Sequence, residues 1–425
     1  MARRRHPRPR FGVIGMTSAL RSRGFIALMA TQGFTVLNDN LFKQVVLLLA
    51  VNVQLSNPSD GFCNDLQACT GMLFAIPFLL FGTFAGDLAD RYSKRRMILI
   101  AKSLEIVVML LAALAFALDS FTGLAVVLFL MGTQSALLGP AKYGALVEIL
   151  PRSYLGRGNG IMQAVVLAAI LLGMGSAGYL KESYAEHLWV LGLGYAVIGA
   201  IGLALAWWIP NLPAADPTRM LRANPWIPVQ NGLRMCLKVP GLPAAILGHA
   251  LYWLVGASLV FAWNEMGQNL LFVPERAWTA KLATLSISTA LGCLIAGRLC
   301  RDSIPLRLPI IGGFGMAVSF FAVALGPYHP TYIWMALVVG SFFAGFYIIP
   351  LRTLVQRLPN RSHTGRALGI SQFSDWTGIV CASLLKSSLT ALGLNSIQSF
   401  WVFGALLAVG SLWVGRRLHF HLKTD

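Results

Sequence analysis

Charged residues are scarce in this chain. Only 12% of its 425 residues are charged, whereas soluble domains carry about 25%, and just 16 of the charged residues are acidic. Hydrophobic residues make up 56% of the sequence, and the mean hydropathy is +0.67. This composition excludes an ordinary soluble domain and indicates a membrane protein.

Sequence motifs for catalysis and metal binding are also missing. None of the seven histidines is followed five residues later by an aspartate, the pair that lipid acyltransferases use as base and orienting group. The chain has no GxSxG nucleophile turn and no GxxxxGK[ST] phosphate loop. No spacing of Cys and His resembles a metal site. We therefore expect a protein that is not an enzyme and needs no cofactor or metal.

Cysteines are few, and most of them suggest no disulfide framework. Cys293, Cys300 and Cys381 fall in apolar stretches, where cysteine serves as a small packing residue. Cys63 and Cys69 lie in or beside the first loop predicted to face outward, where a disulfide can form if that compartment is oxidising. A bridge and two unpaired thiols both remain open for this pair.

Apolar stretches of about 20 residues, long enough to cross a bilayer, occur in two groups of six. They cover 25–53, 69–89, 96–118, 121–148, 158–181 and 188–209, then 241–264, 279–300, 307–327, 331–351, 365–390 and 397–418. The segment between the groups is rich in Pro and Arg and has no sustained apolar face. We predict a six-helix bundle at 25–209, a cytoplasmic linker at 210–240 and a second six-helix bundle at 241–418. Residues 1–24 form a basic tail and residues 419–425 a short one.

Basic residues mark the orientation of the predicted helices. Most of the 34 Lys and Arg residues fall in alternate loops, as expected when basic loops stay in the cytoplasm. Twelve spans with both termini cytoplasmic fit this distribution, which indicates a multi-pass membrane protein. The net charge of +18 then reflects topological anchors, because a nucleic-acid site needs a basic surface on a folded polar domain. We expect no nucleic-acid partner.

A charged motif joins the second and third predicted spans. The stretch AGDLADRYSKRRMIL contains Gly86, Asp90, Arg91 and Arg95. A glycine allows close helix approach, and an acid at a helix end can accept hydrogen bonds from a neighbouring helix N-terminus. The stretch resembles the signature loop of the major facilitator superfamily, which implies an all-α fold of two six-helix bundles and a gating role for these four residues. The second-half counterpart, AGRLCRDSIPLRLP, has Arg301 where Asp90 would align. We therefore expect no equivalent carboxylate contact at the corresponding position of the second bundle.

A narrower resemblance covers most of residues 25–415. The stretches LNDNLFKQ, LLGPAKYGALVEILP and SQFSDWTGIV resemble bacterial lysophospholipid transporters. This resemblance implies alternating-access flipping of lysophosphatidylethanolamine-like lipids across or between leaflets of the inner membrane. It also implies contact with membrane lipids, a separate acyltransferase as partner, and a monomeric state. One departure is that the seventh span has Val260 and apolar neighbours where such transporters can carry a cavity cation.

Two alternative functions stay open at this stage. One is a proton-coupled facilitator that exports amphipathic drugs or metabolites, with Asp39 or Asp375 as the titrating acid. The other is a non-transporting membrane subunit that only binds a partner. A polar cavity open to substrate would favour transport, and a filled core would favour the subunit.

The first span places Asp39 and Lys43 one helical turn apart. A charge at mid-bilayer costs on the order of 2.5–3.5 kcal/mol, so membrane-buried ions pair or line a wet cavity. Gln32 lies on nearly the same helix face, and Asn40 adds polar groups nearby. We predict that these four side chains bind substrate, with an ion pair between Asp39 and Lys43; a purely structural ion pair is the alternative.

Three residues of later spans are also predicted to bind substrate. Lys142 follows a Gly-Pro break in the fourth span, where a phosphate site is expected, although pairing with Glu148 is an alternative. Gln372 and Asp375 lie in the eleventh span, and Asp375 matches an acidic position of the resembled transporters. A structural pair is expected in the third span from Lys102 and Glu105, with side chains that can reach the cytoplasmic interface.

Glycines of the fifth span suggest where the two bundles move against each other. Gly173, Gly175 and Gly178 are expected to pack against the second bundle, with Gly292 and Gly297 on the facing helix. Rocking of one bundle against the other around a site at mid-depth is the expected transport cycle.

Overall fold

The computed structural model describes residues 19–56, 66–221, 226–271, 273, 275–301 and 303–422, and these residues form helices and connecting loops without a strand. The first half of the chain contributes α1 (Arg23–Ser56), α2 (Leu66–Arg91), α3 (Lys94–Ala117), α4 (Phe121–Ile149), α5 (Leu155–Ser183) and α6 (Trp189–Ala206). The second half contributes α8 (Leu242–Glu265), α9 (Glu275–Leu299), α10 (Arg307–Leu325), α11 (Pro330–Arg357), α12 (Thr364–Ala391) and α13 (Ser399–Leu422). Between them lies α7 (Trp226–Leu237). Short one-turn elements precede or follow these helices at Arg152–Tyr154, Met266–Leu270 and Arg361–His363.

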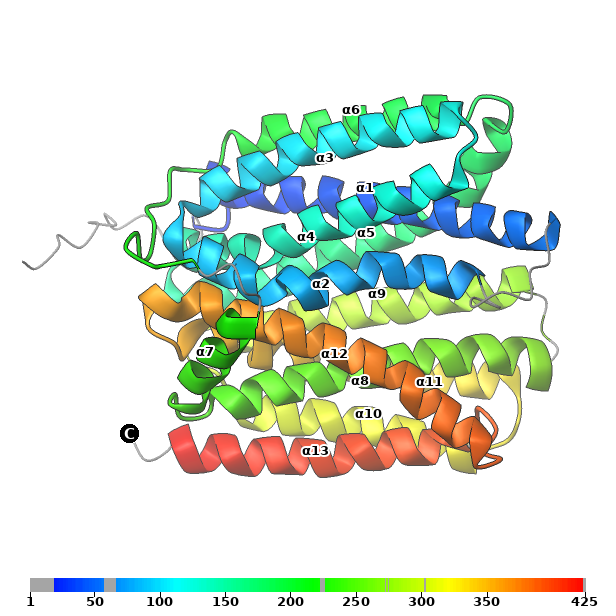
Figure 1. The fold of residues 1–425 in the computed structure, drawn as a ribbon. Helices are drawn as coiled ribbons and strands as arrows, with labels where there is room; N and C mark the ends of the chain where they lie inside the picture. The colour runs from blue at the N-terminus through cyan, green and yellow to red at the C-terminus, as the bar shows by residue number, and fades with distance from the viewer. Residues whose placement is uncertain are drawn as a thin grey trace, which may run out of the picture.

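The twelve long helices confirm the predicted spans, with ends that differ by a few residues. Among the described residues, 11 helices are long and apolar enough to cross a membrane. The twelfth, α12, is 28 residues long but carries Arg366, Asp375 and Lys386 along its length. It packs between α2 and α8 (Figure 1), and these three charged side chains all form ion pairs with other helices.

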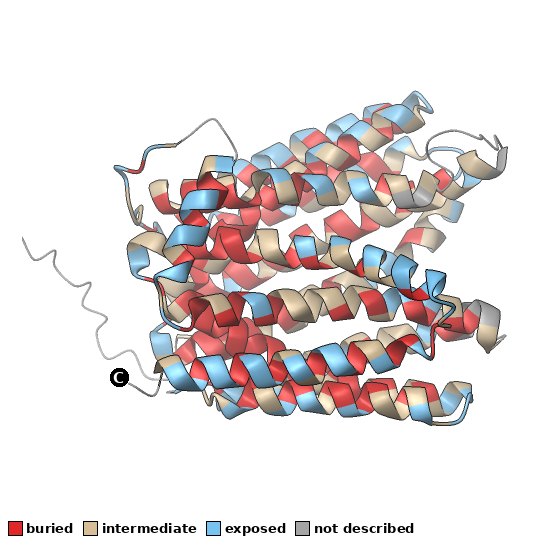
Figure 2. Ribbon diagram, turned by 60° about the horizontal axis from the view of Figure 1, so that its bottom comes forward, coloured by how far each residue is buried: buried red, intermediate tan, exposed pale blue. Residues whose placement is uncertain are grey.

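The helices form two six-helix bundles that lie side by side (Figure 1). Within the first bundle α2 packs on α4, α3 on α6, and α1 on α5; within the second, α10 packs on α11 and α13, and α12 on α8. The bundles meet along two seams, α2 with α12 and α5 with α9. Buried residues gather along these inner faces, whereas the outer helix faces carry exposed apolar side chains such as Ile100, Leu104, Val107 and Leu111 of α3 (Figure 2). An apolar exterior is what a surrounding bilayer requires.

The linker contains a helix that the sequence did not single out. α7 buries Pro228, Val229, Gly232 and Cys236 on one face and crosses the ends of α12 and α8 (Figure 1). The helix is only 12 residues long, so its buried face is too short to stand out in the sequence as a sustained apolar stretch.

Two other predictions fall partly outside the described residues. Cys69 is disulfide-bonded, and Cys63, the partner that the sequence suggested, lies outside the described residues. Of the predicted basic tail at 1–24, residues 1–18 also lie outside the described residues. We use "basic end" for the end of the bundles that holds the turn between α2 and α3, the linker and the turn between α11 and α12.

Candidate functional site

A cavity of about 290 Å³ lies between the two bundles near the middle of the helices. It is lined by α1, α2, α4 and α5 of the first bundle and by α8, α11 and α12 of the second. All seven residues predicted to bind substrate line it: Gln32, Asp39, Asn40, Lys43, Lys142, Gln372 and Asp375. The helical periodicity therefore turned these polar side chains away from lipid, as the cost of an exposed membrane charge requires.

Asp39 is anchored to α4 rather than to its own helix. The hydroxyl of Ser135 donates to Asp39 Oδ2 at 2.7 Å. Oδ1 of Asp39 and Nε2 of Gln32 are buried and have no hydrogen-bond partner among the described residues. Because unpaired buried polar atoms are costly, these two atoms suit a polar group of a ligand in the cavity.

Lys43 does not form the predicted ion pair with Asp39. Its ammonium lies over the ring of Phe74 on α2, 5.3 Å from the ring centroid, and no Asp39–Lys43 pair occurs among the ion pairs of the described residues. The long lysine side chain reaches the neighbouring helix, where a cation over an aromatic face is stabilised. The two charges therefore line the cavity separately.

Lys142 and Arg352 both lie close to one aromatic ring. The ammonium of Lys142 lies 5.5 Å from the ring centroid of Tyr143, and the guanidinium of Arg352 lies 4.5 Å from it. The alternative pairing of Lys142 with Glu148 is wrong, because Glu148 pairs with Lys94 at 2.5 Å. α4 runs without interruption through Pro140, so the expected break is absent and Lys142 projects from a continuous helix.

Asp375 is shared between two basic groups of the second bundle. Its Oδ1 lies 2.6 Å from Nδ1 of His249, and its Oδ2 accepts from Arg352 at 3.4 Å. His249 is fully buried, and its Nε2 has no partner among the described residues. The second-bundle side of the cavity thus holds a His–Asp–Arg cluster.

The remaining lining residues close the cavity and give it an apolar wall. Asn40 donates to the Val36 carbonyl at 2.8 Å, and Gln372 donates across the interface to the Ala136 carbonyl at 3.0 Å. The ring of Phe78 stacks on Trp376 with centroids 4.2 Å apart. The cavity therefore has charged groups on both bundles beside a stacked aromatic pair.

Lys102 and Glu105 form a structural pair, as expected, but not at the interface. Their charged atoms are 2.6 Å apart, and both side chains are 0% exposed. Asn38 donates to the other oxygen of Glu105 at 2.8 Å, and Thr35 accepts from Lys102 at 3.2 Å. The pair is thus sealed inside the first bundle, and neither side chain reaches water.

The bundles are fastened together at the basic end by the motif between α2 and α3. Asp90 accepts from the backbone nitrogens of Gly365 and Arg366, at 2.7 and 3.0 Å, where α12 begins. A β-carbon on Gly86 would lie 2.6 Å from the Gly365 carbonyl oxygen, so the seam needs glycine there. Both predicted contacts are therefore present.

The two basic residues predicted to gate are held by groups of the first bundle. Arg91 lies over the ring of Tyr92, with 5.5 Å between its guanidinium and the ring centroid. Arg95 donates to the Trp207 carbonyl at 2.9 Å. Both therefore brace the first bundle, and the cations at the seam come from elsewhere.

The linker supplies the main cation at this seam. Arg219 pairs with Asp87 at 3.1 Å and with Asp90 at 3.2 Å, and it donates to the Ser362 carbonyl at 3.0 Å. Asp216 also pairs with Arg219 at 3.2 Å, and hydrogen bonds from Thr218 and Arg219 hold the pKa of the Asp216 carboxyl below its usual value. One arginine thus joins the linker to both bundles.

Comparison with known proteins identifies the architecture. The family model of the Major Facilitator Superfamily matches residues 28–383. The chain belongs to the major facilitator superfamily. Two solved facilitators share its fold at low identity: the proton:xylose symporter XylE has a TM-score of 0.75 at 14% identity, covering 93% of this chain and 96% of that one. The human organic anion transporter MFSD10 has a TM-score of 0.78 at 12% identity, covering 92% and 99%.

Curated relatives of this facilitator include proteins named lysophospholipid transporter LplT. The protein from Klebsiella pneumoniae strain 342 is 29% identical over 409 residues, which cover 94% of this chain and 98% of the relative. Those from Cronobacter sakazakii and Escherichia coli K12 are 28% and 26% identical, each covering 94–95% of this chain and 97–98% of the relative.

The predicted glycine contacts between the bundles were partly wrong, as the seam between α5 and α9 shows. Gly173 packs against α1 of its own bundle, and a β-carbon on Gly175 or Gly178 would meet no atom within 4 Å. The close approach between α5 and α9 occurs nearer the basic end, where a β-carbon on Gly156 would lie 2.5 Å from Cβ of Cys300. Gly297 does lie at the seam, with its missing β-carbon 2.7 Å from the Gly156 carbonyl oxygen.

Arg352 and His249 are the site residues that the sequence reasoning missed. A signal for Arg352 was present, because Pro140 and Lys142 in α4 share a spacing with Pro350 and Arg352 in α11. Duplicated halves place matching positions of corresponding helices around one central cavity. His249 has no such signal, since a single histidine in an apolar helix is compatible with simple packing.

Proposed function

We propose that this facilitator transports lysophospholipids, of the lysophosphatidylethanolamine type, across or between leaflets of the bacterial inner membrane by alternating access. One observation carries the proposal: the cavity between the bundles is lined by an acidic group, Asp39, and by two cations, Lys142 and Arg352, and it adjoins an apolar wall. The names of the curated relatives support the same substrate.

The headgroup chemistry matches the two kinds of charge in the cavity. A phosphoethanolamine headgroup carries one ammonium and one phosphate. The unpaired Oδ1 of Asp39 suits the ammonium, whereas Lys142 and Arg352 suit the phosphate, for which a guanidinium can supply two parallel hydrogen bonds. The single acyl chain would then lie along Phe78 and Trp376, which line the same cavity.

Arg352 also offsets the missing cation of the seventh span. Trp253 is the residue of α8 that lines the cavity, and Val260 lies further along the same helix and is 41% exposed. Arg352 approaches from α11 and lies, like Lys142, close to the ring of Tyr143. We infer that phosphate binding has moved from the seventh span to this pair.

Alternating access follows from the contacts at the basic end. We place this end in the cytoplasm, because the basic loops gather there. Its two seams are closed by Asp90 against α12 and by Gly156 against α9, which corresponds to a conformation shut toward the cytoplasm. Release of these seams would expose the cavity on that side. We further expect a monomer that delivers its lipid to a separate acyltransferase.

The test is uptake of labelled lysophosphatidylethanolamine by vesicles that contain the purified protein. Asp39→Asn and Lys142→Gln should each lower uptake at least about tenfold, the loss expected for one charge-assisted contact. The matched controls are Asp119→Asn and Lys238→Gln, because both side chains are exposed outside the cavity. Asp119 has φ 46°, a conformation that asparagine also adopts readily. Wild-type uptake by both cavity variants would refute the proposed headgroup site.

A second candidate function is favoured by the His249–Asp375 contact. A buried imidazole at 2.6 Å from a carboxylate can exchange a proton, as a proton-coupled exporter of amphipathic compounds requires. For this function, a pH gradient without any lipid gradient should drive efflux of an amphipathic dye, and His249→Gln should abolish that efflux. If lysolipid uptake persists without a pH gradient while dye efflux is absent, this candidate is excluded.

A further inference from the structure

A second hollow lies on the outside of the first bundle, away from the cavity between the bundles. It is a groove of about 330 Å³ formed by α2, α3 and α4. Ile100 and Leu104 on its wall are 51% and 44% exposed. The groove is therefore open on the outer surface of the bundle. For a membrane-spanning bundle, this surface faces lipid.

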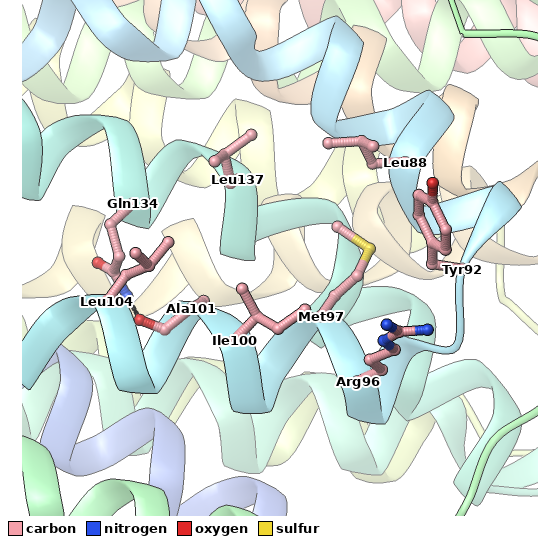
Figure 3. A pocket seen from close by; sticks show the side chains of 9 residues that line it. All are labelled: Leu88, Tyr92, Arg96, Met97, Ile100, Ala101, Leu104, Gln134 and Leu137. Atoms are coloured by element: carbon pink, nitrogen blue, oxygen red, sulfur yellow. Dashed lines mark hydrogen bonds between the residues drawn. The ribbon is translucent and has the colours of Figure 1, made fainter.

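The groove is cationic at one end only. Arg96 and Tyr92 lie at the end nearest the turn between α2 and α3, and Leu104 and Gln134 lie at the other (Figure 3). From Arg96 to Leu104 the helix rises about 12 Å, and the wall between them is apolar, with Leu137 opposite. A cationic and aromatic end followed by an apolar channel has the polarity of a membrane lipid.

Arg96 is the cation of this turn that has no protein partner in the described part of the chain. Lys94 pairs with Glu148 at 2.5 Å, Arg95 donates to the Trp207 carbonyl, and Arg91 lies over the Tyr92 ring. The side chain of Arg96 is exposed, and no acidic residue lines the groove. The charge of Arg96 is therefore uncompensated at the groove, which favours an anion at this depth of the membrane.

We propose that this groove binds one anionic phospholipid, with its phosphate on Arg96 and an acyl chain along Ile100, Leu104 and Leu137. The guanidinium can donate two hydrogen bonds to a phosphate, and Tyr92 sits at the headgroup level, where amphipathic rings are enriched. A lipid with a second, positively charged headgroup atom gains less, because that atom would approach the cations of the same turn. The lipid is a resident partner, separate from the molecule that the central cavity carries.

The groove also contacts the network that holds Asp39. Gln134, at its inner end, donates to the Ala101 carbonyl at 3.1 Å, and its Oε1 lies 3.1 Å from the hydroxyl of Ser135. Ser135 in turn donates to Asp39. A bound acyl chain would keep water away from Gln134 and so support the position of Ser135.

Binding can be measured by native mass spectrometry of the purified full-length protein. The protein is offered equal amounts of phosphatidylglycerol and phosphatidylcholine, without lysolipid, and the retained lipids are counted. We expect one retained phosphatidylglycerol per chain, with preference over phosphatidylcholine of about tenfold. Equal retention of the two lipids would overturn the assignment of an anionic ligand.

Variants separate the two ends of the groove. Arg96→Gln should remove the preference for phosphatidylglycerol, and Ile100→Trp should lower retention of both lipids by filling the channel. Arg417→Gln is the matched control, because Arg417 is also exposed, in α13, far along the chain from the groove. Unchanged phosphatidylglycerol retention in both groove variants, at normal size-exclusion behaviour, would overturn the site. The measurement needs no transport, so it stands apart from the test of the lysolipid proposal.

Discussion

The carboxylate of Asp90, at the end of α2, accepts a hydrogen bond of 2.7 Å from the backbone nitrogen of Gly365, where α12 begins. The first backbone N–H groups of a helix have no partner within the helix and carry its positive dipole end. A carboxylate placed there forms charge-assisted bonds, and in this protein those bonds join the two bundles. Opening the basic end requires that they break.

Asp90→Asn should weaken the closure of the basic end. Asparagine can still accept a hydrogen bond, but without the charge the contact loses roughly half its strength. Cys300 reports the opening, because it is fully buried in the seam between α5 and α9 and becomes accessible to reagents only when that seam opens. We expect several-fold faster maleimide labelling of Cys300 in the variant.

The labelling experiment has its own background and control. Cys300→Ser defines the signal from the other cysteines, and Asp119→Asn repeats the same chemical change at an exposed site. If Asp90→Asn and Asp119→Asn label at the same rate, the carboxylate does not hold the basic end closed.

Gly86→Ala should open the same seam by steric conflict. The added β-carbon would lie 2.6 Å from the Gly365 carbonyl oxygen and 3.1 Å from Cα of Gly369. Backbone atoms cannot move aside cheaply, so α2 and α12 must separate. Cys300 should label faster than in wild type, whereas Gly175→Ala should behave as wild type because no atom lies within 4 Å of its added carbon. Equal labelling in the two alanine variants would contradict this account.

Arg219→Gln should loosen the linker from both bundles. The arginine pairs with three carboxylates, those of Asp87, Asp90 and Asp216. Its removal leaves Asp90 and Asp216 without an ion-pair partner among the described residues, and leaves Asp87 with Arg366 alone. Arg219→Lys keeps the charge but cannot form the same forked contacts, so it should fall between wild type and Arg219→Gln. Limited proteolysis of the linker would show the order, and a lysine variant cleaved as fast as the glutamine variant would argue against a role for charge.

Sequence reasoning was most successful where membrane physics leaves few choices. An apolar stretch of about 20 residues can satisfy its backbone in lipid only as a helix, so the spans were predictable to within a few residues. For the same reason the charges at Asp39, Lys142 and Asp375 had to face inward, and the structure brings all of them to one cavity. Their role in substrate binding stays a prediction.

The contacts that depend on tertiary packing could not be predicted from the sequence. The Lys43 ammonium could be stabilised either by the carboxylate of Asp39 or by an aromatic ring. Only the position of Phe74 on α2 decides between these two contacts. Arg219 lies in a segment without apolar periodicity, yet folding places it between two bundles. The seam glycines were misplaced because several glycines of α5 share the required spacing, and only the crossing point with α9 selects Gly156 and Gly160.

Glu105→Gln should destabilise the first bundle strongly. Lys102 would remain fully buried without its counter-ion, a change that typically costs about 3–5 kcal/mol. The apparent melting temperature in detergent should fall well below that of the exposed control Glu182→Gln. Adding Lys102→Met to Glu105→Gln removes the stranded charge and should recover part of the loss. A double variant that is less stable than the single one would show that the charge is tolerated.

Exchanging the charges of Asp39 and Lys43 tests whether they act as a pair or separately. A direct ion pair survives reversal, so a double variant Asp39→Lys with Lys43→Asp would regain uptake that each single variant loses. The structure predicts the opposite, because Asp39 is held by Ser135 and Lys43 by the ring of Phe74, and neither partner suits the exchanged charge. Lysolipid uptake by the double variant should therefore stay below about a tenth of wild type, the loss expected for one or more charge-assisted contacts. Its size-exclusion profile serves as the folding control, and recovery toward wild-type uptake would mean that the two side chains pair during the cycle.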